Sequence, residues 1–286
     1  MLLHCFFMSI STILLKYVQP YYKIIQIIFS YNLIICLILG SLSLCSKSNI
    51  LKISLNNIGY HFLRSIFGFI GFLLFFYAIS NMNIIEARAI ISIDPIITSI
   101  LALFFFRESI NINKIVASII TFIGSITLLH PSNIEVSAAS VSAFSAAIFF
   151  GVFNNITKKI TSGKVIEQMF YLSFFSLIYS FIPSLYCWNN AIWLTHIFLI
   201  VVIASTFVLS SFCAFNAFKN TELTLLMPLH FVGLVFSSLM GYLIFHEIPG
   251  YLTILGSCII LTGTLPLFVS NISNKNINTF INFKKY

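Results

Sequence analysis

Apolar residues follow one another along this chain in long runs that do not alternate with polar positions. An α-helix needs about 20 apolar residues to cross the ~30 Å hydrocarbon core of a bilayer. Lipid offers no partner to backbone N–H and C=O groups, so these runs are predicted to be helices, which pair their own backbone groups. The runs end at Pro, Gly, Asn or charged residues and predict ten membrane-spanning helices. The ten are Leu2–Tyr17, Ile24–Leu44, Phe62–Ser80, Ile84–Phe106, Ile115–Leu129, Ala138–Ile156, Ile166–Cys187, Trp193–Phe218, Leu223–Phe245 and Tyr251–Val269.

One segment of the chain recurs at a fixed offset. FFFRESININKIVASIITFIG, residues 104–124, aligns without a gap with LIFHEIPGYLTILGSCIILTG, residues 243–263. The offset is 247 minus 108, or 139 residues, and three identities at this spacing are Glu108 with Glu247, Ser118 with Ser257, and Gly124 with Gly263. We therefore predict two copies of a five-helix unit, residues 1–130 and 137–270, followed by a short cytoplasmic tail, residues 271–286.

An odd number of helices in each unit makes the second copy cross the membrane in the opposite sense. The predicted fold class is an all-α integral membrane protein whose ten transmembrane helices form two inverted five-helix repeats. Such repeats place a substrate site near the midplane and allow alternating access by rocking one half against the other. The alternative is that duplication only built a stable bundle, as in a membrane scaffold that transports nothing.

The basic residues predict the orientation. With both termini in the cytoplasm, only Lys16 and Lys23 flank an outer loop, in agreement with the positive-inside rule, and Arg88 alone is left well within a span. The other twelve are cytoplasmic: Lys47, Lys52, Arg64, Arg107, Lys114, Lys158, Lys159, Lys164, Lys219, Lys275, Lys284 and Lys285. The predicted location is a bacterial inner membrane.

Composition narrows the class of protein further. Of the 286 residues, 59% are hydrophobic and 8% are charged, far from a soluble composition. The net charge of +8 does not indicate nucleic-acid binding, because the basic residues are scattered singly at the ends of apolar runs. The sequence has no Walker A, G-x-S-x-G or H-E-x-x-H motif and no clustered His and Cys ligands, so it predicts no enzyme, metal or cofactor. Transport would draw on a gradient or on exchange.

Asp94 is the most informative candidate site residue. It lies ten residues into its predicted helix, about 15 Å deep, where an Asp usually marks a pathway or has a partner. The following Pro95 frees the carbonyl of Ile91, and together these acceptors suit a cationic substrate or a coupled proton. The alternative is a protonated or structurally paired Asp94. An ion pair with Arg88 is disfavoured, because six positions separate the two by about 120° around a helix.

Three more candidate site residues lie in the same predicted helix as Asp94 or in the related helix of the second copy. Glu86 and Arg88 enter near the outer end of the same helix, where Glu86 can border a cavity entrance and Arg88 either gates it or extends to the headgroups. His230 follows Pro228 in nearly the equivalent region of the second copy. Its imidazole either carries protons or substrate, or is a satisfied interior group.

Three amides complete the set of candidates. Asn154, Asn155 and Asn216 either face the cavity or hydrogen-bond between helices. Two charged residues are given structural roles instead. Arg64 is predicted to be a solvated anchor at the cytoplasmic start of its helix. Glu108 is predicted to cap the helix that follows it, although its recurrence also suits a gating contact.

One segment resembles a known protein family more strongly than the rest of the chain does. It is YAISNMNIIEARAIISIDPIITSILALFFFRESININKIVASIITFIGSITLL, residues 77–129. It contains a polar turn, a Pro in the fourth helix, a Glu at the next turn and a Gly late in the fifth helix. The second copy keeps Ala217, Asn220, Pro228, Glu247 and Gly263. On these residues the chain resembles the EamA-type ten-helix members of the drug/metabolite transporter superfamily, and it is similar to the S-adenosylmethionine uptake carriers of intracellular bacteria.

The resemblance implies a secondary transporter for a small polar metabolite, with S-adenosylmethionine uptake as the best single prediction. An exporter of amino acids or drugs on the same fold is the alternative. The predicted partners are a small-molecule substrate, cationic if Asp94 binds it, and the lipid bilayer. No nucleic acid is expected.

Overall fold

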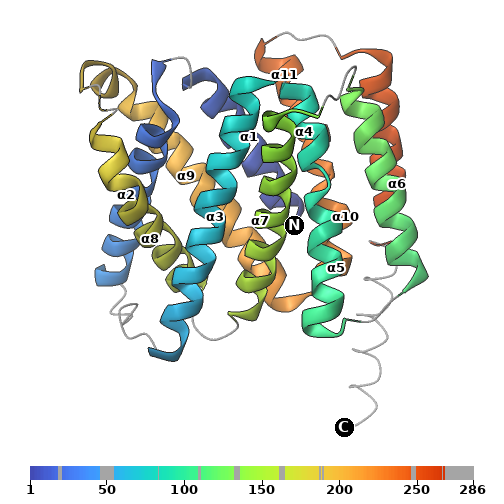
Figure 1. Ribbon diagram of the computed structural model, residues 1–286, viewed down its shortest axis with the longest axis horizontal. Coiled ribbons are helices and arrows are strands. Elements are labelled where there is room, and N and C mark those ends of the chain that lie inside the picture. The colour runs from blue at the N-terminus through green and yellow to red at the C-terminus, as the bar shows by residue number, and fades with distance from the viewer. Residues whose placement is uncertain are drawn as a thin grey trace.

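The computed structural model of the protein is shown in Figure 1. It describes residues 1–18, 21–45, 55–82, 84–108, 111–131, 136–160, 165–186, 188, 190–245, 249–265 and 267. Throughout these ranges the secondary structure is helical, with no strand. The predicted all-helical fold class is confirmed for the part of the chain that the structure describes.

Eleven numbered helices and a final apolar helix follow one another along the chain. They are α1 (Leu2–Val18), α2 (Ile24–Cys45), α3 (Leu55–Asn81), α4 (Ile84–Ile91), α5 (Asp94–Phe106), α6 (Ile112–Leu129), α7 (Ala138–Lys159), α8 (Val165–Leu185), α9 (Asn190–Asn220), α10 (Leu223–His230), α11 (Val232–Phe245) and the final helix Tyr251–Leu265. In Figure 1 the long helices stand side by side and run between the same two edges of the molecule.

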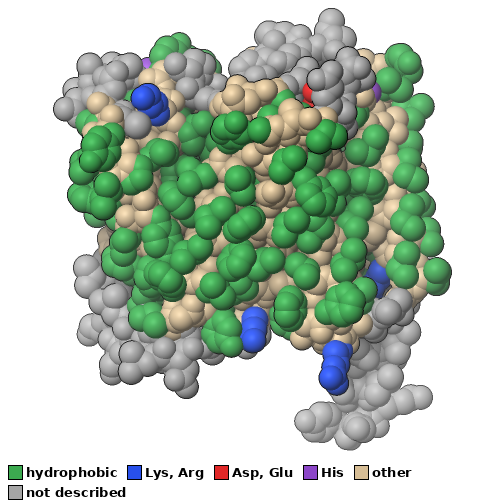
Figure 2. Space-filling model, in the orientation of Figure 1, with side chains coloured by type: hydrophobic (Ala, Val, Ile, Leu, Met, Phe, Trp, Pro, Cys, Tyr) green, Lys and Arg blue, Asp and Glu red, His purple; other side chains and the backbone are tan. Residues whose placement is uncertain are grey.

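Eight helical segments in the described ranges are long and apolar enough to cross a membrane. Two more apolar helices, Leu2–Leu15 and Tyr251–Leu265, are shorter. Figure 2 shows the consequence for one face, where apolar side chains cover the middle and the visible Lys and Arg side chains lie towards the two edges. Such a surface is what a multi-pass protein presents to lipid.

Two predicted helices are interrupted. The sequence predicted a continuous helix at Ile84–Phe106, but the structure divides it into α4 and α5, with Pro95 in the first turn of α5. A proline has no N–H to donate and its ring crowds the preceding turn, so the helix breaks just before it. The predicted helix Leu223–Phe245 is likewise divided at Phe231 into α10 and α11, and Pro228 lies in the last turn of α10.

The helices pack in a regular order. α3 packs against α7 and α8, and α9 packs against α1 and α2. α5 packs against α7, and α11 packs against α1, while α2 and α8 contact each other. The largest cluster of buried apolar residues draws on α1, α2, α5, α8, α9 and α10, and two smaller clusters lie apart from it, one of which includes residues of α6 and of the final helix.

Close contact between α6 and the final helix depends on glycine. A Cβ atom added at Gly256 would lie 2.6 Å from the Cα atom of Leu128, and one added at Gly124 would lie 2.9 Å from the backbone nitrogen of Ile260. Both distances are shorter than real Cβ contacts. Small residues allow backbones to approach in this way in membranes, where dispersion contacts between helices contribute much of the association.

Candidate functional site

Asp94 lies at the break between α4 and α5. It is the first residue of α5, twelve residues before the helix ends at Phe106. At ~1.5 Å per residue this places it about 18 Å from that end of the span. Its exposed fraction is only 7%. The broken helix therefore holds a carboxylate deep within the bundle.

Three polar residues surround this carboxylate. Thr98 Oγ1 donates a hydrogen bond to Asp94 Oδ1 at 2.9 Å. Asn154 Nδ2, from α7, contacts the same Oδ1 at 3.4 Å and Thr98 Oγ1 at 3.2 Å. Asn155 Nδ2 donates to the Thr98 carbonyl at 3.1 Å. We call these four residues the Asp94 cluster.

A glycine brings α7 close enough to make these contacts. A Cβ atom at Gly151 would lie 2.7 Å from Ile97 Cγ2. Gly151 also offers its carbonyl to Asn155 Nδ2 at 2.8 Å. The amide of Asn155 thus bridges α5 and its own helix, which fixes its orientation.

The Asp94 cluster has spare hydrogen-bond acceptors. Within the described ranges, both donors to Asp94 contact Oδ1, which leaves Oδ2 without a donor. The buried Oδ1 of Asn155 has no hydrogen-bond partner either. Fully buried polar atoms normally have partners, so the unpaired oxygen of Asn155 needs an explanation. A cationic group or a proton supplied from outside the protein would satisfy these acceptors.

The other candidates on α4 and α9 are not members of the Asp94 cluster. Glu86 and Arg88 are half-buried residues of α4, and no ion pair joins Arg88 to Asp94 in the part of the chain that the structure describes. Asn216 donates to the Phe212 carbonyl of its own helix at 2.8 Å, which satisfies one of its donors within α9.

His230 lies at the other helix interruption, as the last residue of α10. Its ring centroid is 5.8 Å from that of His4 on α1, and His4 Nδ1 contacts Ser210 Oγ at 2.8 Å. His4 lies near the beginning of an apolar run, so no sequence signal marked it as a candidate. No contact among the described residues joins this histidine pair to the Asp94 cluster.

Arg64 is buried, so its predicted role as a solvated anchor is wrong. Its exposed fraction is 0%, and Nη2 contacts the Gln168 carbonyl of α8 and, at 3.5 Å, His61 Nδ1. The guanidinium lies 5.1 Å from the ring centre of Phe215 on α9. The error arose because the predicted helix began at Phe62, whereas α3 begins seven residues earlier.

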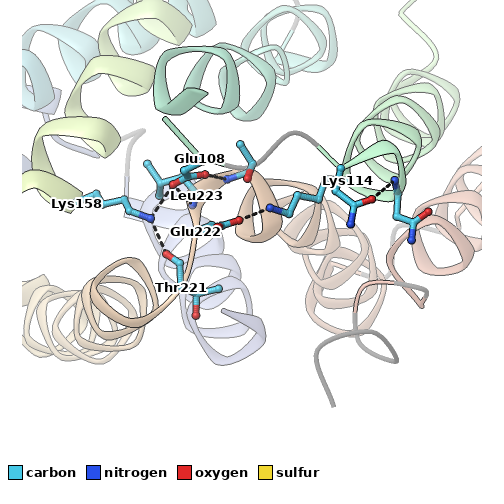
Figure 3. Close-up of polar contacts among 9 residues, drawn as sticks. Glu108, Lys114, Lys158, Thr221, Glu222 and Leu223 are labelled. Atoms are coloured by element: carbon cyan, nitrogen blue, oxygen red, sulfur yellow. Dashed lines mark hydrogen bonds and ion pairs between the residues drawn. The ribbon is translucent and has the colours of Figure 1, made fainter. Parts of the chain in front are cut away.

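A network of polar contacts lies where the ends of α5, α7 and α9 meet (Figure 3). Glu108 Oε1 accepts from Lys158 Nζ at 2.7 Å and from the backbone N–H of Leu223 at 2.9 Å, and its Oε2 accepts from the N–H of Thr224 at 2.9 Å. Lys158 Nζ also donates to the Thr221 carbonyl at 2.8 Å. Burial raises the pKa of the Glu108 carboxyl, but these hydrogen bonds outweigh burial and hold that pKa below its ordinary value.

Glu108 therefore does not cap the helix that follows it. Asn111 caps α6, by accepting from the N–H of Asn113 at 3.0 Å, while Glu108 caps α10 from the opposite half of the chain. Beside it, Lys114 forms an ion pair with Glu222. Among the described residues, no three His, Cys, Asp or Glu side chains lie close enough together to hold a metal ion.

Comparison with known proteins identifies relatives of this chain. The profile of the EamA-like transporter family matches residues 1–129. The S-adenosylmethionine uptake transporter of Rickettsia bellii is 30% identical over 73% of this chain and 72% of its own length. The riboflavin transporter of Vibrio cholerae is 24% identical over 71% and 68%, and the pseudopaline exporter of Pseudomonas aeruginosa is 22% identical over 71% and 72%.

A solved crystal structure shares the fold. It superposes with a TM-score of 0.77 over 92% of each chain, at 13% sequence identity. The family profile and the rickettsial relative, which is similar over more than two thirds of both chains, establish that the chain is a transporter rather than an enzyme. The chain belongs to the EamA-like transporter family.

Proposed function

We propose that this protein is a secondary transporter that takes up S-adenosylmethionine across a bacterial inner membrane by alternating access. The observation that carries the proposal is the Asp94 cluster, in which a buried carboxylate at a helix break has one oxygen without a donor among the described residues, and the amide oxygen of Asn155 is also unpaired. S-adenosylmethionine carries a sulfonium and an ammonium group, and either one complements these acceptors. Four rickettsial relatives that are S-adenosylmethionine uptake transporters support the choice of substrate.

The proposed architecture is ten spans in two inverted five-helix repeats, with both termini in the cytoplasm. The helix interruptions support it, because Phe231 follows Ser92 by 231 minus 92, or 139 residues, the offset already found between the repeated segments. The packing supports it too. When helices are matched by this offset, the contact of α3 with α7 corresponds to that of α9 with α1, and the contact of α5 with α7 corresponds to that of α11 with α1.

Uptake of radiolabelled S-adenosylmethionine into bacteria that express the chain tests the proposal. We expect saturable uptake by the wild type and a loss of about tenfold or more for Asp94→Asn, because a charge-assisted hydrogen bond contributes roughly 1.5–3 kcal/mol. Thr127→Val is the matched control, since it removes a hydroxyl of α6 that bonds to the Ile123 carbonyl of its own helix at 2.9 Å and is not among the candidate site residues. Expression at the membrane must be equal for all three proteins.

Each outcome has a distinct meaning. Normal uptake by Asp94→Asn would refute the site and leave the substrate assignment in place. Absence of uptake by a wild-type protein that is present in the membrane would refute S-adenosylmethionine import.

Export is the second candidate function. The pseudopaline exporter among the relatives favours it, since proteins of similar sequence move solutes outwards. Cells preloaded with labelled amino acids would then lose label faster when they express the chain. If neither uptake nor efflux exceeds that of the empty vector and no substrate changes the melting temperature, the scaffold alternative is the one that stands.

A further inference from the structure

We propose that Arg64 binds the carboxylate of the substrate, and so makes the transporter selective for molecules that carry an amino-acid end. The inference rests on the proposed function, because it deepens the description of the substrate and of the site that receives it. Neither the sequence resemblance nor the names of the relatives assign a role to this residue.

The first step is the position of Arg64 within the bundle. It lies on α3 and contacts α8 through the Gln168 carbonyl and α9 through the ring of Phe215. Its exposed fraction is 0%, so neither lipid headgroups nor bulk water reach it in this state. The span of α3 begins at Ile58, six residues earlier, which places Arg64 about 9 Å inside the membrane.

The second step is the missing counter-charge. A guanidinium stays charged in proteins, and a charge within a membrane is usually paired with an opposite charge or with backbone carbonyls. The ion pairs in the described part of the chain are Lys114 with Glu222 and Lys158 with Glu108, and neither involves Arg64. One carbonyl and an imidazole nitrogen are the only acceptors that it contacts there. Among the described residues, no anionic group contacts Arg64.

The third step is the count of unused donors. A guanidinium has five N–H groups, one on Nε and two on each Nη atom. In the described residues, Nε and Nη1 are buried without a hydrogen-bond partner, so three of the five N–H groups are unused. Guanidinium and carboxylate groups match in planar geometry, and two oxygens of one carboxylate can accept from two of these donors.

The fourth step is the relation of Arg64 to the Asp94 cluster. One turn further along α3, Gly68 lies against Phe153 of α7, where an added Cβ would be 3.1 Å from Phe153 Cδ2. The next residue of α7 is Asn154, which contacts Asp94. The site with unused donors therefore lies one turn of α3 from a contact with α7, the helix that also borders the site with unused acceptors. Such a pair complements a substrate that carries an anionic group and a cationic group.

A structural role for Arg64 is the competing explanation. On that view the guanidinium only fastens α3 to α8 and α9, and its removal would weaken the fold without changing which ligands bind. The two roles differ in one measurable respect. Only a ligand contact makes the effect of substitution depend on whether the ligand has a carboxylate.

The test is a comparison of two ligands on the purified full chain in lipid nanodiscs. S-adenosylmethionine and its decarboxylated analogue share the sulfonium, the amine and the adenosine, and differ in the carboxylate. We expect the wild type to prefer S-adenosylmethionine by about tenfold or more, as a charge-assisted hydrogen bond predicts. Arg64→Met should lose this preference and keep its affinity for the decarboxylated analogue. Arg107→Gln, which changes an exposed arginine, is the matched control and should behave as the wild type.

Further variants and outcomes keep the inference falsifiable. Arg64→Lys retains a positive charge and loses the planar fork, so it should show a reduced preference even if Arg64→Met does not fold. A full preference in either folded variant would overturn the inference. Equal binding of the two ligands by the wild type would overturn it while leaving the substrate in place. Binding of neither ligand by the wild type would overturn the proposed function and this inference with it.

Discussion

Among the residues that the structure describes, only one oxygen of the Asp94 carboxylate has a donor, and Thr98 holds it at 2.9 Å. The hydroxyl of Thr98 also receives the amide of Asn154, so it orients two groups of the cluster at once. Removal of this hydroxyl would leave the charge of Asp94 unchanged and free its side chain to rotate. Thr98 is therefore a positioning residue, whose effect should appear in substrate affinity before it appears in folding.

We expect Thr98→Val to raise the KM for uptake several-fold and to lower the free energy of unfolding by about 1 kcal/mol, the usual contribution of one hydrogen bond. Thr121→Val is the matched control, because Thr121 is equally buried and its hydroxyl bonds to the Ala117 carbonyl of its own helix at 2.7 Å. Uptake kinetics and thermal melting measure the two effects. A KM raised equally in both variants would contradict the positioning role.

At the same scale, the sequence located some of these residues and missed others. Asp94, Asn154 and Asn155 were recognisable because amides and acids are rare deep within apolar runs. Thr98 was missed because a threonine is common in transmembrane helices, although its position one turn after Asp94 was a usable signal. Arg64 was misjudged for another reason. Its depth depends on where α3 begins, and the polar residues before Phe62 resembled a loop.

Among the elements, Glu108 joins three parts of the chain that are distant in sequence. It binds Lys158 at the end of α7 and caps α10 from the turn between α5 and α6. Its pKa is held below the ordinary value, so its stabilising contribution is present above about pH 4.5 and is lost as the pH falls through the lowered pKa of the folded state. We expect the melting temperature of the wild type to fall on acidification below that pH, and that of Glu108→Gln to fall less.

The control for this prediction is Glu222→Gln. The side chain of Glu222 is 43% exposed in its ion pair with Lys114, whereas that of Glu108 is 4% exposed. Exposed pairs contribute little to stability, so this variant should keep the pH dependence of the wild type. Melting of the purified proteins at several pH values gives the comparison. An unchanged acid response in Glu108→Gln would show that other carboxylates dominate it.

The contact between α6 and the final helix makes a separate prediction. Gly256→Ala would place a methyl group against the backbone of Leu128, and overpacking of this kind costs about 1–3 kcal/mol. Gly59→Ala is the control, because nothing lies within 4 Å of its added Cβ. We expect a lower melting temperature for the first variant and no loss for the second. Equal melting temperatures would indicate that α6 and the final helix can move apart enough to accommodate the added methyl group without loss of stability.

For the whole molecule, the apolar pattern alone predicted the helical fold class, because lipid forces each apolar run to satisfy its own backbone. It also predicted ten spanning helices, whereas the described residues contain eight helical segments long and apolar enough to span and two shorter apolar helices. It could not predict the two interruptions, since a run remains apolar whether or not its helix is continuous. Nor could it predict that Glu108 caps a distant helix, because that contact depends on how the halves meet. Local sequence determines where the helices form, whereas the contacts between the first and second halves of the chain depend on three-dimensional packing.

The two interrupted helices have a consequence for the direction in which a substrate lies. Under the proposed duplication, the position equivalent to Asp94 is 94 plus 139, or Gly233, and the position equivalent to His230 is 230 minus 139, or Ile91. Each break has therefore kept one polar side chain that its counterpart lacks, an acid in one half and an imidazole in the other. A pair of equivalent breaks could receive a ligand in two orientations related by the pseudo-twofold axis. Because the two breaks carry different polar side chains, the two orientations are no longer equivalent, and a bound molecule is expected to adopt one of them.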